Sequence, residues 1–148
     1  MANREEPDWT WSLLKTIPSS KDEGHKLVDE LRTALTDEGW DGSDFFHVQM
    51  AAEEALINAI THGNKEDPTK TVELEFRVSD QTAFLRFKDQ GEGFNPEDLP
   101  DPTADENLDV IHGRGVFLIR ELMSEIEYNE SGNEVRMWKH RTKEPAEA

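Results

Sequence analysis

The sequence predicts an α+β domain, a two-layer α/β sandwich in which a mixed, mostly antiparallel sheet is covered on one face by helices. Two observations carry this prediction. Strand-like segments follow each other directly at 72–78 with 83–87 and at 125–128 with 134–139, and such neighbours pair antiparallel. The helical segments each have a single apolar stripe, which must be buried against one face of the sheet. The pattern does not fit a doubly wound parallel sheet.

The chain begins with a strand and then a helix. Trp9, Trp11 and Leu13 alternate with polar residues, which predicts a strand that ends near Pro18. The segment 20–23, Ser-Lys-Asp-Glu, is a capping box that begins the first helix.

A second helix is predicted to begin at Ser43 or Asp44, since either residue can act as its cap, and to stop at residues 62–63. Both helices have apolar residues at helical spacing. These are Leu27, Val28, Leu31, Ala34 and Leu35 in the first helix, and Val48, Ala52, Ala55 and Ala59 in the second.

The second half of the chain contains the two predicted hairpins, with turns at 79–81 and 131–133. The segment 95–112 between them is too long and too polar for a simple connection, and we expect a functional lid there. Residues 116–123 are expected to form a third helix.

The length and composition indicate one domain. The 148 residues fit a single core, which we place at 9–142 between flexible ends at 1–8 and 143–148. No apolar run is long enough to span a membrane, and the polar N-terminus does not resemble a signal peptide. There is no Cys, so disulfides and thiolate zinc sites are excluded. The expected location is the cytoplasm, with no membrane partner.

The formal net charge of −17 argues against binding to nucleic acid through phosphate contacts. It permits a basic protein partner, whose approach the opposite charge would accelerate. The alternative is that the charge serves solubility alone.

Glu54 and Asn58 are the first candidate site residues. They are four positions apart and therefore share one face of the second helix, on a stripe with His47, Ala51 and Thr61. An Asn oxygen is a hard neutral ligand that suits Mg²⁺, and a nearby Glu can orient or deprotonate an attacking hydroxyl. Taken alone, the pair is better explained as an ordinary polar face of an exposed helix.

Asp89 ends a predicted strand and precedes Gly91 and Gly93. A buried carboxylate at a strand end can accept a hydrogen bond from an exocyclic amine, such as the 6-amino group of adenine. The glycines let the backbone approach a flat ligand. The alternative is a plain turn whose Gly supplies a positive φ.

Gly113 and Gly115 flank Arg114 directly before the predicted third helix. Amide groups at a helix N-terminus can bind phosphate, and Arg114 can add a charge-assisted contact. The motif is neither a Walker P-loop nor a dinucleotide fingerprint. The alternative is a simple cap between loop and helix.

Taken in order, these motifs resemble those of the GHKL (Bergerat-fold) ATPases. The stretch 54–59 is similar to the N box of that superfamily, 89–94 to its first glycine box and 113–115 to its second. The resemblance implies ATP and Mg²⁺ as cofactors, with Glu54 as catalytic base and Asn58 as Mg²⁺ ligand. It also implies that Asp89 reads adenine in a pocket shaped by Gly91, Gly93, Phe94, Gly113, Arg114 and Gly115.

Within the superfamily, the stretches 58–63 and 115–119 are similar to bacterial anti-sigma factors that are also protein serine kinases. The resemblance implies two partners, a sigma factor and a STAS-domain antagonist that is phosphorylated on Ser or Thr, and it permits a homodimer. One position departs from the pattern. Relatives often have Thr after the final hairpin glycine, where this chain has Asn133, an amide that can still hydrogen-bond to adenine.

The sequence thus predicts an ATP-dependent protein serine/threonine kinase that is also an anti-sigma factor. Two other functions stay open. One is a noncatalytic nucleotide-binding module of a partner-switching pathway, because a carboxylate does not prove catalysis. The other is the catalytic domain of a histidine kinase, although the segment before Glu54 is too short for dimerisation helices and a phospho-accepting His.

Overall fold

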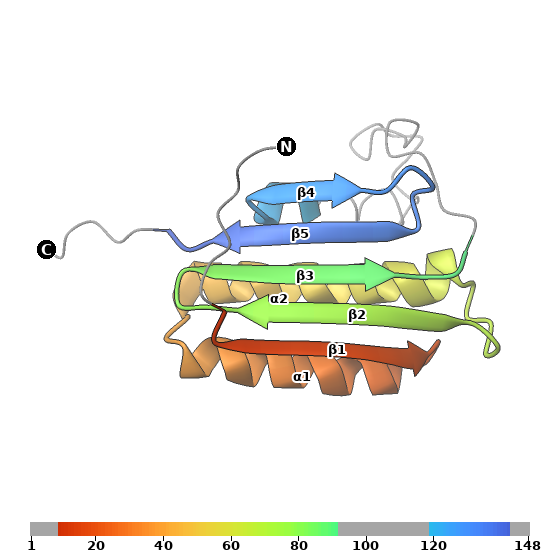
Figure 1. Ribbon diagram of the computed structural model, residues 1–148, viewed down its shortest axis with the longest axis horizontal. Coiled ribbons are helices and arrows are strands. Elements are labelled where there is room, and N and C mark those ends of the chain that lie inside the picture. The colour runs from red at the N-terminus through yellow and green to blue at the C-terminus, as the bar shows by residue number, and fades with distance from the viewer. Residues whose placement is uncertain (1–8, 92–118, 143–148) are drawn as a thin grey trace, which may run out of the picture.

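The structure is a computed structural model that describes residues 9–91 and 119–142. Within these residues the chain forms α-helices α1 and α2, a short π-helix, five strands and a helical segment at 119–122 (Figure 1). In chain order the principal elements are β1 (Trp11–Pro18), α1 (Lys21–Asp37), α2 (Gly42–Ile57), η1 (Asn58–Gly63), β2 (Thr71–Val78), β3 (Thr82–Lys88), β4 (Glu125–Tyr128) and β5 (Glu134–His140).

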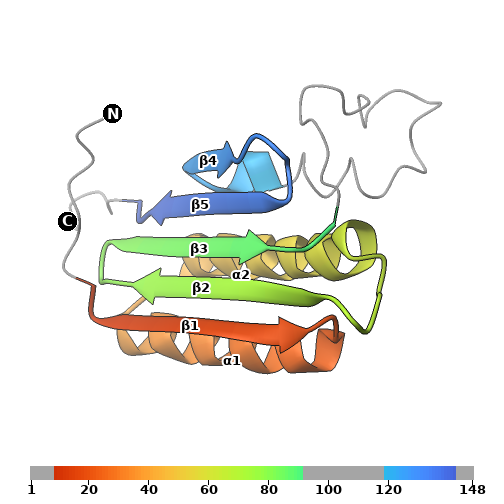
Figure 2. The ribbon, with the colours of Figure 1, turned by 45° about the vertical axis from the view of Figure 1, so that its right-hand side comes forward.

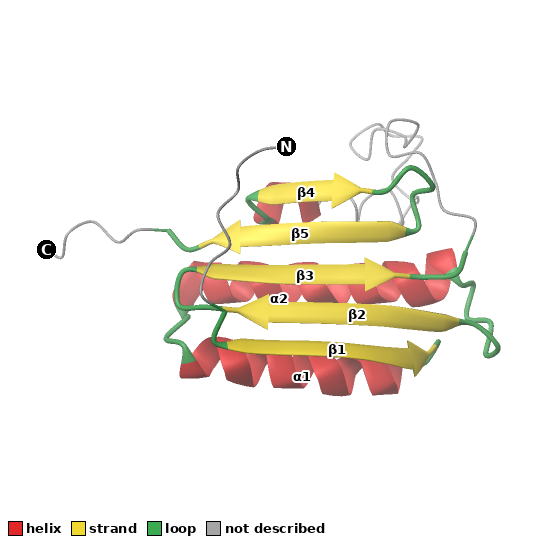
Figure 3. Cartoon of the chain, in the orientation of Figure 1, coloured by secondary structure: helices red, strands yellow, loops and turns green. Residues whose placement is uncertain are grey.

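The five strands form one sheet in the order β1-β2-β3-β5-β4. All four pairings among these strands are antiparallel. Helices α1 and α2 lie side by side across one face of the sheet, as Figure 3 shows. The two-layer α/β sandwich is therefore confirmed, and no parallel pair occurs among the described strands.

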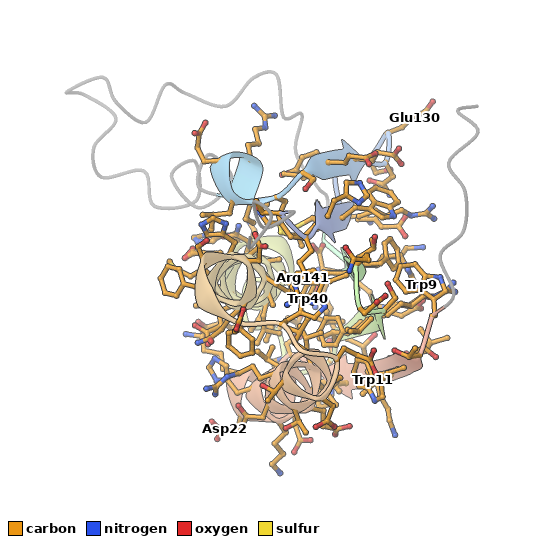
Figure 4. All side chains as sticks on the ribbon, turned by 90° about the vertical axis from the view of Figure 1, so that its left-hand side faces the viewer. Trp9, Trp11, Asp22, Trp40, Glu130 and Arg141 are labelled. Atoms are coloured by element: carbon orange, nitrogen blue, oxygen red, sulfur yellow. The ribbon has the colours of Figure 1, made fainter. Side chains whose placement is uncertain are left out.

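The core lies between the helices and the sheet, as the end-on view of Figure 4 shows. All nine stripe residues expected from the helical spacing are buried, and the strands contribute alternate residues such as Leu74, Phe76 and Leu85. At one end of this layer, the Trp40 indole donates a hydrogen bond of 2.9 Å to the Ser79 carbonyl. The apolar periodicity therefore identified the buried faces correctly.

The predicted start of α1 is confirmed, whereas that of α2 is wrong. Ser20 is the N-cap of α1, and its hydroxyl accepts a hydrogen bond from the Glu23 amide. The N-cap of α2 is Asp41, not Ser43 or Asp44. The Asp44 carboxylate instead accepts hydrogen bonds from the amide (2.8 Å) and the hydroxyl (3.0 Å) of Thr142. A partner 98 residues away thus replaces the local cap.

The second helix does not end as a regular α-helix. Its last six residues form η1, in which the Asn64 amide donates to the Ala59 carbonyl, five residues earlier, at 2.8 Å. Such π-helical turns are rare and occur frequently at functional sites. This wider turn shifts the residues after Asn58 relative to the face that a continuous α-helix would present.

Both predicted hairpins are present. The amide and hydroxyl of Ser79 both donate to the Thr82 carbonyl in the turn between β2 and β3. In the β4–β5 turn, Gly132 adopts a φ of 76°, which favours glycine. Residues 119–122 are helical, in agreement with the end of the predicted third helix. The expected lid at 95–112 and the expected flexible ends lie outside the described residues. In the described part of the chain, no helix has the length and apolarity needed to cross a membrane.

Candidate functional site

Asp89 and Asn133 lie together where β3 ends and β5 begins, and the end of η1 contacts this turn through Gly63. Figure 2 shows the end of β3 beside the C-terminal end of the helix that begins as α2. The Asp89 amide donates a hydrogen bond of 2.9 Å to the carbonyl of Asn133, which precedes β5. The next amide, that of Gln90, donates at 2.7 Å to the side-chain oxygen of Asn64, which follows η1. Hydrogen bonds on both sides therefore fix the turn that presents Asp89.

The carboxylate of Asp89 lies directly against Gly63, the last residue of η1. A Cβ atom at Gly63 would come within 2.3 Å of Asp89 Oδ2, so only glycine fits there without displacing the carboxylate. The amide of Gly91 donates a hydrogen bond of 2.8 Å to Asp89 Oδ1. The η1 segment and the aspartate are thus in contact.

Gly91 is required for a related reason. A Cβ atom at Gly91 would come within 1.9 Å of the Gly63 carbonyl oxygen, which is backbone and cannot rotate away. The turn after β3 can therefore approach η1 only because both residues are glycines. The sequence predicted Gly91 from the motif but did not single out Gly63.

Burial raises the pKa of the Asp89 carboxyl above its ordinary value of 3.8, although the Gly91 amide and the charge of Lys70 oppose this shift. A carboxylate that is partly desolvated in this way forms stronger hydrogen bonds with a donor than one in water. Asp89 therefore has the environment expected of a group that accepts a hydrogen bond from a bound base.

Glu54 and Asn58 are both partly buried, Glu54 in the last turn of α2 and Asn58 at the start of η1. Neither side chain forms a hydrogen bond or ion pair with another described residue, so both remain available to a ligand. One turn later, the Thr61 hydroxyl is buried without a hydrogen-bond partner in the described part of the chain. An unpaired buried hydroxyl is costly, and a ligand or a water bound with it would supply the partner.

His62 links Glu54 electrostatically to the end of η1. Burial lowers the pKa of His62 below its ordinary value of 6.5, and the negative charge of Glu54 partly opposes this shift. The imidazole is thus neutral near pH 7 and adds no positive charge to the site.

The polar stripe expected on the second helix is only partly correct. Ala51 is fully buried in the core. The His47 ring nitrogen Nδ1 lies 3.1 Å from Lys139 Nζ, which also donates to the Leu122 carbonyl at 2.9 Å. Burial, with the charge of Lys139 second, lowers the pKa of His47. The stripe fails because α2 packs against β5 on this side, so His47 belongs to a helix–sheet contact.

Asn133 has a different local role from the one expected. Its side-chain oxygen accepts a hydrogen bond of 2.7 Å from the Asn129 amide group, and its backbone amide donates to the Asn129 oxygen at 3.0 Å. These bonds shape the turn whose carbonyl holds Asp89. A contact between the Asn133 amide group and adenine stays a prediction.

Among the described residues, a magnesium ion fits as an ion held by one protein oxygen together with phosphate and water. These residues contain no group of three or more His, Cys, Asp or Glu side chains arranged to hold a metal ion. Mg²⁺ is often bound through one or two protein oxygens, with the remaining positions filled by phosphate and water. The unpaired amide oxygen of Asn58 suits that mode, in which the ion enters with the nucleotide.

Five predicted site residues lie outside the described residues. They are Gly93, Phe94, Gly113, Arg114 and Gly115. The phosphate-binding half of the expected pocket therefore stays a prediction.

Asn64 and Gln90 are the neighbours of the site that the sequence did not single out. Asn64 is fully buried, and Gln90 accepts a hydrogen bond of 2.7 Å from the Thr71 amide through its side-chain oxygen. The available signal was the run His-Gly-Asn at 62–64, directly after the Glu54–Asn58 motif, because Asn side chains at the end of a helix readily hydrogen-bond to backbone groups.

A one-sided antiparallel sandwich whose second helix contains Glu54 and Asn58, and whose third strand leads into Asp89, has the layout of a domain of the GHKL type. The comparison with protein families agrees, since the sequence profile of the histidine kinase-like ATPase domain matches residues 17–139. The chain belongs to this family.

Proteins similar to the chain include serine-protein kinases. Two relatives, each named serine-protein kinase RsbW, come from Staphylococcus aureus strains JH9 and Newman. Each is 31% identical to the chain over 109 residues, which is 68% of this chain and 69% of the relative. The family supports ATP binding, and both relatives are named as serine-protein kinases.

A solved structure shares the fold. It is the crystal structure of the RsbU and RsbW domains of Rv1364c from Mycobacterium tuberculosis, with a TM-score of 0.58 at 21% sequence identity. The match covers 93% of this chain but only 34% of that longer chain. The likeness supports the arrangement of helices and sheet.

Proposed function

We propose that the chain is an ATP-dependent protein serine/threonine kinase that also acts as an anti-sigma factor. It binds a sigma factor and phosphorylates a Ser or Thr on a STAS-domain antagonist. The observation that carries the proposal is the contact between η1 and Asp89. The element η1 begins with Asn58 and ends at Gly63, which lies against the Asp89 carboxylate, so one short element joins the candidate Mg²⁺ ligand to the candidate acceptor for adenine.

Each described residue has a distinct task in this proposal. The Glu54 carboxylate accepts the proton of the substrate hydroxyl, and the Asn58 oxygen ligates Mg²⁺. Bound ATP supplies the phosphoryl group, whose transfer depends mainly on positioning and on neutralisation of charge. The absence of hydrogen bonds from Glu54 and Asn58 to other described residues supports these tasks.

Asp89 selects the base. One of its oxygens is held by the Gly91 amide, and the carboxylate retains further lone pairs that can accept from the exocyclic amine of adenine. The raised pKa supports this role, because it reflects a carboxyl that burial partly shields from water. Guanine has an oxygen where adenine has that amine, so the carboxylate repels it.

The partners follow from charge and from the relatives. A net charge of −17 makes the chain unsuited to DNA but complementary to a basic protein surface. A sigma factor, which must itself hold DNA, offers such a surface. The relatives named serine-protein kinase RsbW support a phosphorylated protein partner in the same pathway.

The test is transfer of labelled phosphate from ATP to a STAS-domain protein. We expect the wild-type chain to label the partner, and Glu54→Gln to bind ATP but transfer about 10²- to 10⁴-fold more slowly. Glu53→Gln is the matched control, because Glu53 is the adjacent carboxylate and is also partly buried. Its rate should equal that of the wild type.

Three results would contradict the proposal in different ways. Equal transfer by Glu54→Gln would remove Glu54 from the role of base. A wild-type chain that binds ATP and both partners without transfer would be a noncatalytic regulatory module. A chain that binds no ATP would overturn the proposal entirely.

A further inference from the structure

Asn64 is a fully buried polar residue immediately after η1, and its side chain forms three hydrogen bonds. Its Nδ2 donates to the Ser19 hydroxyl and to the Thr71 carbonyl, both at 2.9 Å, and its Oδ1 accepts from the Gln90 amide at 2.7 Å. The orientation of the amide follows from these partners, because a carbonyl only accepts and an N–H only donates.

These bonds join four separate segments of the chain. Ser19 follows β1, Thr71 begins β2, Gln90 follows β3, and Asn64 itself closes η1 through its backbone bond to Ala59. The side chain of Gln90 returns a second bond to the Thr71 amide. Asn64 thus ties the end of the helix layer to three strands at the edge where the site lies.

The bond to Gln90 has a particular consequence for Asp89. The amide of Asp89 is held by the Asn133 carbonyl, and the next amide along the chain is held by Asn64. With the peptides on both sides fixed, the direction of the Asp89 side chain is fixed as well. The carboxylate also packs against Gly63, the residue directly before Asn64.

We propose that Asn64 is the positioning residue that sets the adenine selectivity of the site, because it holds the turn that presents Asp89. The inference rests on the proposed function in one respect, namely that the site binds ATP. Asn64 itself does not touch the nucleotide. Its effect is therefore a change in the preference for adenine over guanine, which a purely structural residue would not alter.

The experiment measures affinities for ATP and GTP, by calorimetry with Mg²⁺, in variants shown by circular dichroism to be folded at the temperature used. We expect the wild type to prefer ATP. We expect Asn64→Ala to weaken ATP binding by about 10- to 100-fold, the value of a hydrogen bond to a charged group, with little change for GTP. The ratio of the affinity for ATP to the affinity for GTP then decreases by the same factor.

Three further variants separate positioning from stability. Asn64→Ser has a hydroxyl too short to reach Gln90, and it should narrow the preference as Asn64→Ala does, even if the alanine variant fails to fold. Asn64→Asp keeps the acceptor for the Gln90 amide but turns an oxygen toward the Thr71 carbonyl, so it should lower the melting temperature while retaining most of the preference for ATP. Ser19→Ala removes another partner of Asn64, so it should lower the melting temperature with the preference unchanged.

An unchanged preference in folded Asn64→Ala or Asn64→Ser, beside a wild type that prefers ATP, overturns this inference and leaves the proposed function intact. So does a wild type that binds ATP and GTP equally. A loss of preference in Ser19→Ala as large as in the Asn64 variants also overturns it, because general loosening would then be the cause. A wild type that binds neither nucleotide overturns the proposed function and the inference together.

Discussion

Replacement of Gly63 by Ala tests the contact on which the site depends. The added Cβ would lie 2.3 Å from Asp89 Oδ2 and 2.4 Å from its Cγ, whereas ordinary contacts begin near 3.4 Å. The carboxylate must therefore move by about 1 Å, enough to break a hydrogen bond to a bound base. Loss of a hydrogen bond to a charged group weakens ATP binding by about 10- to 100-fold.

Gly24→Ala is the matched control for this substitution. Both glycines are helical and neither has a positive φ, so alanine strains neither backbone. A Cβ at Gly24 would lie 2.4 Å from the Leu56 side chain, in the contact between α1 and α2. Overpacking there costs about 1–3 kcal/mol of stability, but it leaves Asp89 in place.

The assay is an ATP titration of each folded variant, with the unfolding midpoint measured in parallel. Gly63→Ala should lose affinity, whereas Gly24→Ala should lose stability and keep the wild-type affinity. Wild-type affinity in folded Gly63→Ala would refute the reasoning, because the Asp89 carboxylate would then tolerate displacement.

Three further predictions concern charge. Burial raises the pKa of Asp89, so its charged form destabilises the fold once the pH exceeds that pKa. In the absence of ligand, Asp89→Asn should therefore have a melting temperature at neutral pH no lower than that of the wild type. A clearly lower melting temperature of the variant would contradict this. Burial lowers the pKa values of His47 and His62, so below their ordinary value of 6.5 the unfolded chain binds protons at these residues more readily than the folded chain does. The free energy of unfolding of the wild type should therefore be highest above pH 6.5 and should decrease as the pH falls below that value. Urea unfolding at about pH 7.5 and at about pH 5.5 should show a smaller loss of unfolding free energy in the double variant with Gln at both positions than in the wild type. An equal loss in both proteins would show that these histidines do not cause the pH dependence. The association rate with a basic sigma factor should decrease as salt rises, because a net charge of −17 steers the encounter, and a rate indifferent to salt would defeat that argument.

The fold was predictable because its signals are local. The alternation in β2 and β3 and the apolar stripes of α1 and α2 each arise from residues close together in sequence, and the structure buries those residues as expected. The Glu54–Asn58 spacing and the position of Asp89 after a strand were also local features.

The remaining features depend on partners far apart in sequence. The N-cap of α2 is Asp41 and not Asp44, since the Asp44 carboxylate binds Thr142, which lies 98 residues after Asp44. The fixed turn at Asp89 needs Asn64, which lies 26 residues from Gln90 and 45 from Ser19. No local pattern encodes such bonds, so the run at 62–64 marks the end of a helix without revealing the partners of Asn64 or the contact of Gly63.

The central claim is that this chain binds ATP through Asp89. Calorimetric titration with ATP and Mg²⁺, on the wild type and on Asp89→Asn, tests it most directly. The account predicts saturable binding at one site per wild-type chain and strongly weakened binding in the folded variant, because an amide can present a donor where adenine needs an acceptor. No heat from the wild type, or equal affinity in both proteins, would contradict it.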